Sequence, residues 1–278
     1  MKIEDIDTNF KPATVGDKEV HYLDATKAPF SLEGFPWGDP SKGEFFRLPA
    51  DMTEADVNNG ALWNGHHNAS GGAVRFRSDS PFFAIRAKLS DSGDMNHMPR
   101  AGSAGFDLYC GPMKNSFHVG TAQPCPREEV LERMLYVRDT CDTGMNDWLV
   151  NFPLYGGLKS IEIGLAPGSV LEAPVPHQNG KIVFYGSSIT QGGCASRPGN
   201  NYCSMLCRAV DAEQINLGFS VAAAAKSQSP RQSPPSRDFR RSSWTTTTTP
   251  RTPSICLPPT SRSSRRYAPS GQSSPSSC

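Results

Sequence analysis

The sequence has no run of about 18–20 apolar residues, which is the length that a membrane-spanning helix needs. Its first five residues, MKIED, are not a hydrophobic leader, so we expect neither secretion nor a membrane partner. The eight cysteines lack the paired spacing of a disulfide framework or a zinc site. They therefore predict reduced thiols in a cytoplasmic protein.

Net charge is also nearly absent, because 28 basic and 27 acidic residues leave +1 over 278 residues. This balance argues against a dedicated nucleic-acid-binding protein. It is the sum of two unlike segments, however, because the composition changes after Ser220. Residues 1–220 carry a net charge of −7, and residues 221–278 carry a net charge of +8.

The segment 221–278 is rich in small, polar and basic residues, with 15 Ser, 9 Pro, 7 Thr and 8 Arg. Its Val, Ile, Leu and Phe residues are Val221, Phe239, Ile255 and Leu257. Such a composition buries too little apolar surface to offset the entropy of ordering, so we expect a disordered tail. Three interpretations compete: a Ser/Arg-rich arm that binds RNA, a Pro/Ser/Thr linker, and a frameshifted translation.

One stretch of this tail favours the frameshift. Trp244, the threonines 245–249 and Pro250 are encoded by TGG, five ACN codons and CCN. Read one base earlier, the same bases encode Leu, Met or Val, then Asp, then four residues from the set Tyr, His, Asn and Asp, and then a small residue or proline. An apolar residue followed by a dense polar cluster is typical of the end of a buried strand.

Short strands are predicted over residues 40–165 by apolar–polar alternation between turn residues. The pattern occurs at 74–77, 83–89, 106–108, 134–137, 148–154 and 161–165. Helical periodicity is confined to residues 127–133. We therefore expect residues 1–175 to form an antiparallel β-sandwich or jelly roll, which ends at the linker APVP of residues 173–176.

A different pattern begins at residue 176. Residues 181–185 (KIVFY) form a continuous apolar run, which is typical of a parallel strand buried on both faces. The small-residue loop GSSITQGG follows at 186–193, and a helix is predicted from residue 198 with four side chains on one face: Tyr202, Met205, Leu206 and Ala209. Residues 215–220 predict a second strand. Residues 176–220 would then be the first β-α-β unit of an incomplete, flavodoxin-like three-layer α/β domain.

Ser188 lies at the carboxyl end of the first predicted parallel strand, where sheets of this kind bind their ligands. A serine between Gly186 and a helix can act as a nucleophile, and its own backbone N–H can donate to an oxyanion. The stretch is not Gly-x-Ser-x-Gly, and it is not a phosphate loop because no Lys follows the glycines. An ordinary turn between strand and helix is the alternative, and the spacing alone favours it.

The histidines and the helix cysteines were considered as further sites. Three histidines are candidate metal ligands: His66, His67 and His97. No ligand spacing recurs among them, so we expect exposed loop residues and no metal site. Cys203 and Cys207 lie four residues apart on the predicted helix and predict buried thiols. No histidine follows Ser188, although a serine nucleophile needs a base.

Two motifs resemble those of a known family. The SGNH/GDSL hydrolases begin with a block whose commoner form is Gly-Asp-Ser-Leu, and this block is similar to Gly186, Ser187, Ser188, Ile189 and Thr190. One bacterial branch carries an N-terminal β-sandwich marked by Gly-x-Asp-Leu-Tyr, which is matched by Gly105, Phe106, Asp107, Leu108 and Tyr109. The resemblance covers about residues 30–220, and the chain is identified as a member of this family.

The resemblance implies a serine esterase that acts on acylated small molecules or saccharides without a cofactor, and that is compatible with a homo-oligomer. Ser188 matches the nucleophile and backbone oxyanion donor, and the four residues around it support the motif. Gly105, Asp107, Leu108 and Tyr109 would be structural. In the family, a Gly after the second strand and a later Asn are further oxyanion donors. A C-terminal Asp-x-x-His supplies the base and its orienting acid.

The sequence departs from this pattern after Ser220. Val221 stands where the glycine is expected, and neither Asn nor His occurs beyond it. The third block of the family resembles Asp-Tyr-Asp-His-Asn-Ala, which the shifted reading of residues 244–250 permits. We therefore expect a hydrolase domain truncated by a frameshift, with negligible ester hydrolysis by this chain. The alternative is a non-catalytic carbohydrate-binding or assembly module formed by the β-sandwich.

Overall fold

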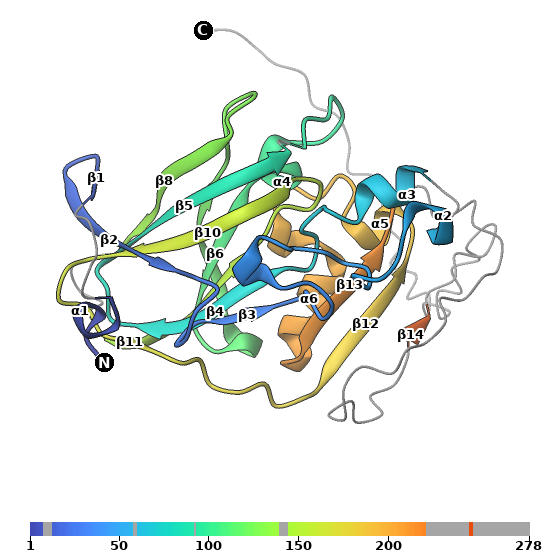
Figure 1. The fold of residues 1–278 in the computed structure, drawn as a ribbon. Coiled ribbons are helices and arrows are strands. Elements are labelled where there is room, and N and C mark those ends of the chain that lie inside the picture. Colours follow the sequence, from blue (N-terminus) through green and yellow to red (C-terminus); the bar gives the residue numbers. More distant parts are fainter. Residues whose placement is uncertain (8–12, 58–59, 92, 139–143, 221–244, 247–278) are drawn as a thin grey trace, which may run out of the picture. The chain divides into compact units, whose positions relative to one another are not determined.

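Strands dominate the computed structural model of the chain, which describes residues 1–7, 13–57, 60–91, 93–138, 144–220 and 245–246 (Figure 1). These residues lie within one unit, Met1–Thr248, and a second unit, Thr249–Cys278, contains none of them. A helix with the length and apolar character to cross a membrane is not found in these ranges. The expected disordered tail, residues 221–278, lies outside the described residues except for Thr245 and Thr246.

Two antiparallel sheets contain the described strands before residue 173. The first has the order β1-β2-β10-β5-β8, formed by Ala13–Val15, Lys18–Asp24, Gly157–Leu165, Phe82–Asp91 and Val130–Val137. The second has the order β11-β4-β9-β6-β7, formed by Leu171–Glu172, Ala73–Ser78, Asn146–Asn151, Phe106–Cys110 and Phe117–Ala122, and β3 (Ser31–Glu33) pairs with β4. We call residues 1–172 the two-sheet region.

One hydrophobic core joins the two sheets. Phe83 and Ile85 of β5 belong to the same buried cluster as Phe106 and Leu108 of β6. In β4, β5, β6 and β9 every second residue contributes to it, because successive side chains of a strand point to opposite faces. This alternation is the pattern from which the strands were predicted, and each of the six predicted segments overlaps a described strand.

The helix expected at residues 127–133 is wrong, because strand β8 begins at Val130 and pairs with β5. Leu131 and Leu135 of β8 are buried in the core. The short helices of the two-sheet region were not predicted; they are α1 (Ile3–Ile6), α2 (Glu54–Val57), α3 (Gly60–Gly65), α4 (Arg100–Ser103) and the 3-10 turns Pro40–Lys42 and Met113–Asn115.

A parallel sheet follows the irregular residues 173–180. Strand β12 (Lys181–Gly186) lies between β13 (Glu213–Gly218) and β14 (Thr245–Thr246), and both neighbours run parallel to it. Helices α5 (Ser188–Gln191) and α6 (Tyr202–Val210) connect β12 to β13, with a 3-10 turn at Pro198–Asn200. We call residues 181–220 the parallel unit; Figure 1 shows its helices beside the two strands.

The burial of the parallel unit differs from the expectation. Strand β12 is not buried on both faces, since Tyr185 is 42% exposed. Helix α6 buries Cys203, Ser204 and Cys207, whereas Met205, on the predicted apolar face, is 52% exposed. The small cysteine and serine side chains let the helix pack closely, so residue size rather than hydrophobicity determines the buried face. The expectation of buried cysteine thiols is confirmed.

Candidate functional site

Ser188 is the first residue of α5 and stands two residues beyond the end of β12. It therefore lies at the edge where open parallel sheets bind their ligands. Ser187 caps the helix, because its side chain accepts a hydrogen bond from the backbone N–H of Ile189 at 3.4 Å. Ser188 is half-buried, and within the described residues its Oγ makes no hydrogen bond. A serine oxygen in this state is available to a ligand.

The turn around Ser188 is closed by its own carbonyl oxygen. This oxygen accepts hydrogen bonds from the backbone N–H groups of Gly192 at 3.0 Å and Gly193 at 2.7 Å. The Tyr155 hydroxyl, from the two-sheet region, also donates to it at 3.4 Å. Gly192 has a φ of 114°, a conformation that glycine adopts without strain. The backbone at Ser188 is therefore fixed from both regions of the chain.

The other residues of the motif divide between packing and surface. A Cβ atom on Gly186 would lie 2.2 Å from the Thr190 hydroxyl oxygen, so this position requires glycine. Thr190 is buried, and its hydroxyl hydrogen-bonds to the Tyr202 hydroxyl at 3.0 Å. Ile189 is 63% exposed. The motif thus combines a close strand–helix approach with an exposed apolar side chain next to Ser188.

Arg47 holds the end of β13 against the two-sheet region. Its guanidinium donates to the carbonyl oxygens of Gly65 at 2.6 Å, Gly218 at 2.6 Å and Asn216 at 3.3 Å, and it lies 4.3 Å from the centre of the Phe219 ring. Burial lowers the pKa of Arg47 to about 9. The side chain is 1% exposed. Its charge is therefore solvated by backbone carbonyls, which fixes where β13 ends.

Residues 106–109 of the Gly-x-Asp-Leu-Tyr motif lie in strand β6, and this strand contacts the parallel unit. Leu108 points into the core, whereas Asp107 and Tyr109 lie on the opposite face. The Asp107 carboxylate accepts hydrogen bonds from the Gly199 backbone N–H and the Asn151 side-chain amide, both at 2.8 Å. Gly199 packs against Tyr109, since an added Cβ would lie 2.4 Å from the ring. The motif therefore forms an interface as well as a strand.

Asp107 is fully buried, and this burial raises the pKa of its carboxyl group to about 6. The hydrogen bonds from Asn151 and Gly199 and the charge of Arg197 lower the pKa but do not outweigh burial. Gly105, two residues earlier, has no room for a side chain, because a Cβ would lie 2.4 Å from the Ala101 carbonyl oxygen.

None of the six histidines, all of which are described, is joined to Ser188 by a hydrogen bond. His177 instead lies between the carboxylates of Glu33 at 3.0 Å and Asp211 at 2.8 Å. Burial alone would lower the pKa of His177, but the hydrogen bonds and charges of these carboxylates raise it overall. His177 thus ties the segment before β12 to both regions.

The exposed-loop expectation is wrong for His66, which is buried. Its ring stacks between Trp63 and His67 and contacts the Trp63 carbonyl oxygen. His67 and His97 are exposed, as expected. Within the described ranges, no group of three or more His, Cys, Asp or Glu side chains could hold a metal ion.

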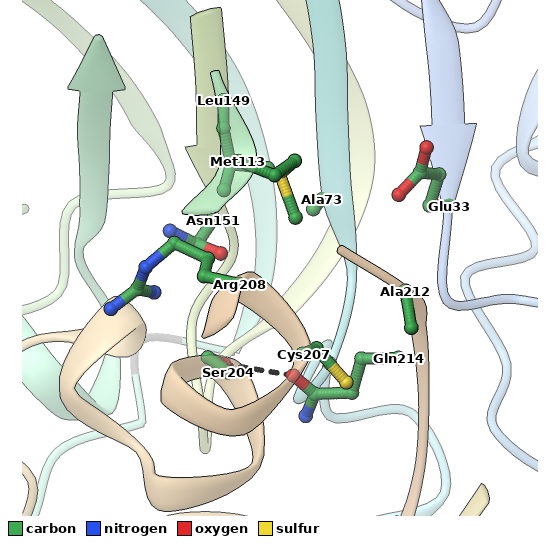
Figure 2. Close-up of a pocket in the computed structure, with 11 residues that line it drawn as sticks. Glu33, Ala73, Met113, Leu149, Asn151, Ser204, Cys207, Arg208, Ala212 and Gln214 are labelled. Atoms are coloured by element: carbon green, nitrogen blue, oxygen red, sulfur yellow. Dashed lines mark hydrogen bonds between the residues drawn. The ribbon is translucent and has the colours of Figure 1, made fainter. Parts of the chain in front are cut away.

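A small cavity of about 20 Å³ lies between α6 and the two-sheet region (Figure 2), and Ser188 is not among its lining residues. It is lined by Glu33, Ala73, Asn151, Cys207, Arg208 and Gln214, among others. The Ser204 hydroxyl donates to Gln214 Oε1 at 2.9 Å, while Gln214 Nε2 has no hydrogen-bond partner among the described residues. A space of this size holds one water molecule, so we regard it as part of the interface.

Sequence reasoning missed the residues that hold the Ser188 turn and the end of β13 in place. Tyr155, which contacts Ser188, and Arg47, which contacts Gly218, come from distant parts of the chain, and nothing in the sequence around either of them marks a functional residue. Gln191 lies inside the loop GSSITQGG, but a glutamine at this position does not predict a functional role. Residues of this kind can be identified only from the folded structure, in which the distant segments lie together.

Comparisons with known proteins agree with both motifs. The model of the N-terminus of SGNH-hydrolase-type esterases matches residues 20–171. The model of a GDSL-like lipase/acylhydrolase family matches residues 179–228. A search of curated proteins finds no match.

Two solved structures are similar to the chain. One, described as a GDSL-like lipase from Bacteroides ovatus, is 29% identical with a TM-score of 0.62, over 72% of this chain and 57% of that one. The other, the salicylyl-acyltransferase of a tetracycline biosynthetic pathway, is 17% identical with a TM-score of 0.54, over 72% of this chain and 54% of that one. The second likeness concerns the fold alone. The chain therefore spans little more than half the length of either.

Proposed function

The chain belongs to the esterases of the SGNH-hydrolase type, and we propose that it carries the first part of a serine esterase site built on Ser188. The observation that supports this most strongly is the position of Ser188. It occupies the family's serine position at the carboxyl end of β12, and its Oγ is free of hydrogen bonds with the described residues. An ordinary strand–helix turn would not need its carbonyl fixed by Tyr155 as well.

In the proposed reaction, Ser188 Oγ attacks the acyl carbon of an ester and forms a tetrahedral intermediate. The backbone N–H of Ser188 donates to the oxyanion, and collapse of the intermediate releases the alcohol and leaves an acyl-enzyme. Water then hydrolyses the acyl group. A base must take the Ser188 proton, and the family supplies it from a histidine beyond the parallel unit.

We propose three segments. Residues 1–175 would be the β-sandwich or jelly-roll domain, residues 176–220 the first β-α-β unit of an incomplete flavodoxin-like hydrolase domain, and residues 221–278 a frameshift product. The ranges of the two family matches, 20–171 and 179–228, support the first boundary. Strand order β13-β12-β14 corresponds to the first three strands of the order 2-1-3-4-5.

The codons around β14 support the frameshift. Thr245 pairs with Phe184 of β12, which is the place of the third strand in a flavodoxin-like sheet. The codons of this stretch permit the family's third block in the other frame. Sequencing the gene beyond codon 220 tests the proposal: an open second frame that ends in Asp-x-x-His supports it, and a frame closed by stop codons contradicts it.

The chain itself should hydrolyse esters negligibly, because neither His nor Asn occurs after Ser220. We expect the full chain and its Ser188→Ala variant to hydrolyse p-nitrophenyl acetate at the same background rate. Robust turnover that Ser188→Ala abolishes would show that another base serves Ser188. By family resemblance, the substrate of the complete site is a small acyl ester or an acylated saccharide, and the reaction needs no cofactor. The cytoplasmic location and a homo-oligomer remain predictions.

The alternative function is a non-catalytic carbohydrate-binding or assembly module formed by residues 1–175. The buried contacts of Arg47 and Asp107 with the parallel unit weigh against it, because a free module would leave both groups without these partners. Titration of residues 1–178 with oligosaccharides is the test. Cooperative folding together with saturable binding would favour the module over the esterase.

A further inference from the structure

Gln191 occupies the centre of the contacts behind Ser188. Its side-chain oxygen accepts hydrogen bonds from the Ser220 backbone N–H at 3.0 Å and the Ser220 hydroxyl at 3.2 Å. Its side-chain nitrogen donates to Asn68 Oδ1 at 3.0 Å and to the Leu154 carbonyl oxygen at 3.1 Å. One amide group thus joins Ser220, two residues after β13, to two segments of the two-sheet region.

The backbone of Gln191 belongs to the same helical turn as Ser188. Its N–H donates to the Ser187 carbonyl oxygen at 3.0 Å, and its own carbonyl oxygen accepts from the Ser70 hydroxyl at 2.6 Å. The residue is 1% exposed. Every hydrogen-bonding atom of its side chain is used, so its position is determined by its partners rather than by packing alone.

Tyr155 closes the network on the other side. The Asn68 amide nitrogen donates to the Tyr155 carbonyl oxygen at 2.6 Å. The Tyr155 hydroxyl donates to the Ser188 carbonyl oxygen at 3.4 Å, and its oxygen lies 3.2 Å from the Ser220 hydroxyl, whose single proton it shares with Gln191 Oε1. A ring of contacts therefore runs through Tyr155, Asn68, Gln191 and Ser220, and the Ser188 carbonyl oxygen is bonded to this ring through Tyr155.

We propose that Gln191 is a positioning residue of the esterase site, through which the two-sheet region sets the spacing between the Ser188 turn and the end of β13. The proposal rests on the proposed function, in which the Ser188 N–H is an oxyanion donor, and on the family resemblance, which implies a second donor after the second strand of the parallel unit. Donors act on an oxyanion only when they are held to within a fraction of an ångström. Ser220 is the last described residue before that second donor.

Glutamine suits this role because its amide offers an acceptor to Ser220 and a donor to Asn68 and Leu154 at once. A methionine at this position has similar volume and flexibility but neither function. Gln191→Met therefore separates the hydrogen bonds of Gln191 from its packing. Gln178, which is exposed and bonds to Lys114, provides a matched control as Gln178→Met.

Amide hydrogen exchange of the full chain tests the proposal without requiring hydrolysis. In Gln191→Met, we expect exchange to accelerate about tenfold both at residues 186–193 and at Ser220, while β5 and β10 stay protected. Gln178→Met should change neither. Unchanged exchange at Ser220 in Gln191→Met would overturn the proposal.

A double-mutant cycle with Asn68→Ala tests whether Gln191 carries the coupling. Asn68→Ala should accelerate exchange at Ser220, to which it makes no hydrogen bond, and should add nothing in the Gln191→Met background. Additive effects would contradict the proposal. If Gln191→Met unfolds the whole chain, exchange in β5 and β10 becomes rapid as well. The Asn68→Ala variant then tests the proposal by itself: unchanged exchange at Ser220 in this variant overturns the proposal. Failure of the proposed function would appear separately, in the ester assays.

Discussion

Arg47 and Asp107, which are buried, and His177, which is half-buried, each join the parallel unit to the two-sheet region. Arg47 binds backbone carbonyls, Asp107 binds a backbone N–H, and His177 binds carboxylates from both regions. Burying such groups is unfavourable unless they keep their hydrogen-bond partners. These three residues therefore favour one position of the parallel unit against the two-sheet region. Their effect on this position is larger than their net effect on the free energy of folding.

Asp107 should make stability depend on pH. Its pKa of about 6 in the folded chain exceeds its ordinary value of 3.8, so the folded state binds more protons between these values. The free energy of unfolding should therefore fall as pH rises from about 4 to about 6, by at most about 3 kcal/mol from this group. In Asp107→Asn, denaturant unfolding across this range should show a flatter profile. An unchanged pH profile would contradict the buried, protonatable state of Asp107.

His177 should act with the same sign in a higher range. Because its folded-state pKa is raised above 6.5, its protonation stabilises the folded chain below pH 6.5, and this contribution is lost as pH rises through the folded-state pKa. His177→Gln should therefore lose stability mainly on the acidic side of that pKa. The exposed His97→Gln is the control and should match the wild type. Equal effects of the two variants would mean that the carboxylate contacts do not stabilise the protonated form.

At the scale of elements, close backbone approaches decide how β12, α5 and β13 fit together. A Cβ on Gly218 would lie 2.2 Å from the backbone nitrogen of Gln191, which cannot move aside as a side chain can. Gly218→Ala should therefore lower the free energy of unfolding by about 1–3 kcal/mol or more. Gly144→Ala, where the added atom meets nothing within 4 Å, should be close to neutral. Thermal unfolding of both variants measures the difference, and similar values would contradict this packing.

The strands were predictable where one face is buried and the other is not. In the second half of β5, Ala87 and Leu89 are buried in the core while Arg86 and Lys88 are not, and this alternation is the one that the sequence shows. The prediction of a helix at residues 127–133 was wrong because the charged residues there fit a helical period. Pairing with β5 instead makes the segment from Val130 a strand. The face of α6 could not be predicted, since Cys203, Ser204 and Cys207 are buried for their size.

Ser188 was predicted from sequence because its motif resembles the first block of the SGNH/GDSL hydrolases, whereas the adjacent strand, glycine and serine alone favoured an ordinary turn. Its surroundings could not be found in this way. Tyr155 contacts Ser188, and Asn68 contacts Tyr155, from segments more than 30 residues away from Ser188, and each contact depends on the packing of the two-sheet region. The Asp107 motif was expected to be structural, and the contacts with Gly199 specify which structure it supports.

At the scale of the whole molecule, the two-sheet region and the parallel unit should be stable together rather than apart. Ending the chain at residue 178 would leave Arg47 without its Gly218 and Asn216 carbonyls and Asp107 without the Gly199 N–H. We expect residues 1–178 to unfold at lower denaturant concentration than the full chain, by several kcal/mol in free energy. Equal stability of the two chains would favour an independent module.

The central claim is that Ser188 is the nucleophile of an esterase site whose remaining groups lie in another reading frame. The most direct measurement is p-nitrophenyl acetate hydrolysis by the product of a gene whose frame is shifted by one base after codon 220. We predict that this product hydrolyses the ester about 10³-fold faster than its own Ser188→Ala variant. Equal rates for the two, in a product that folds, would contradict the claim.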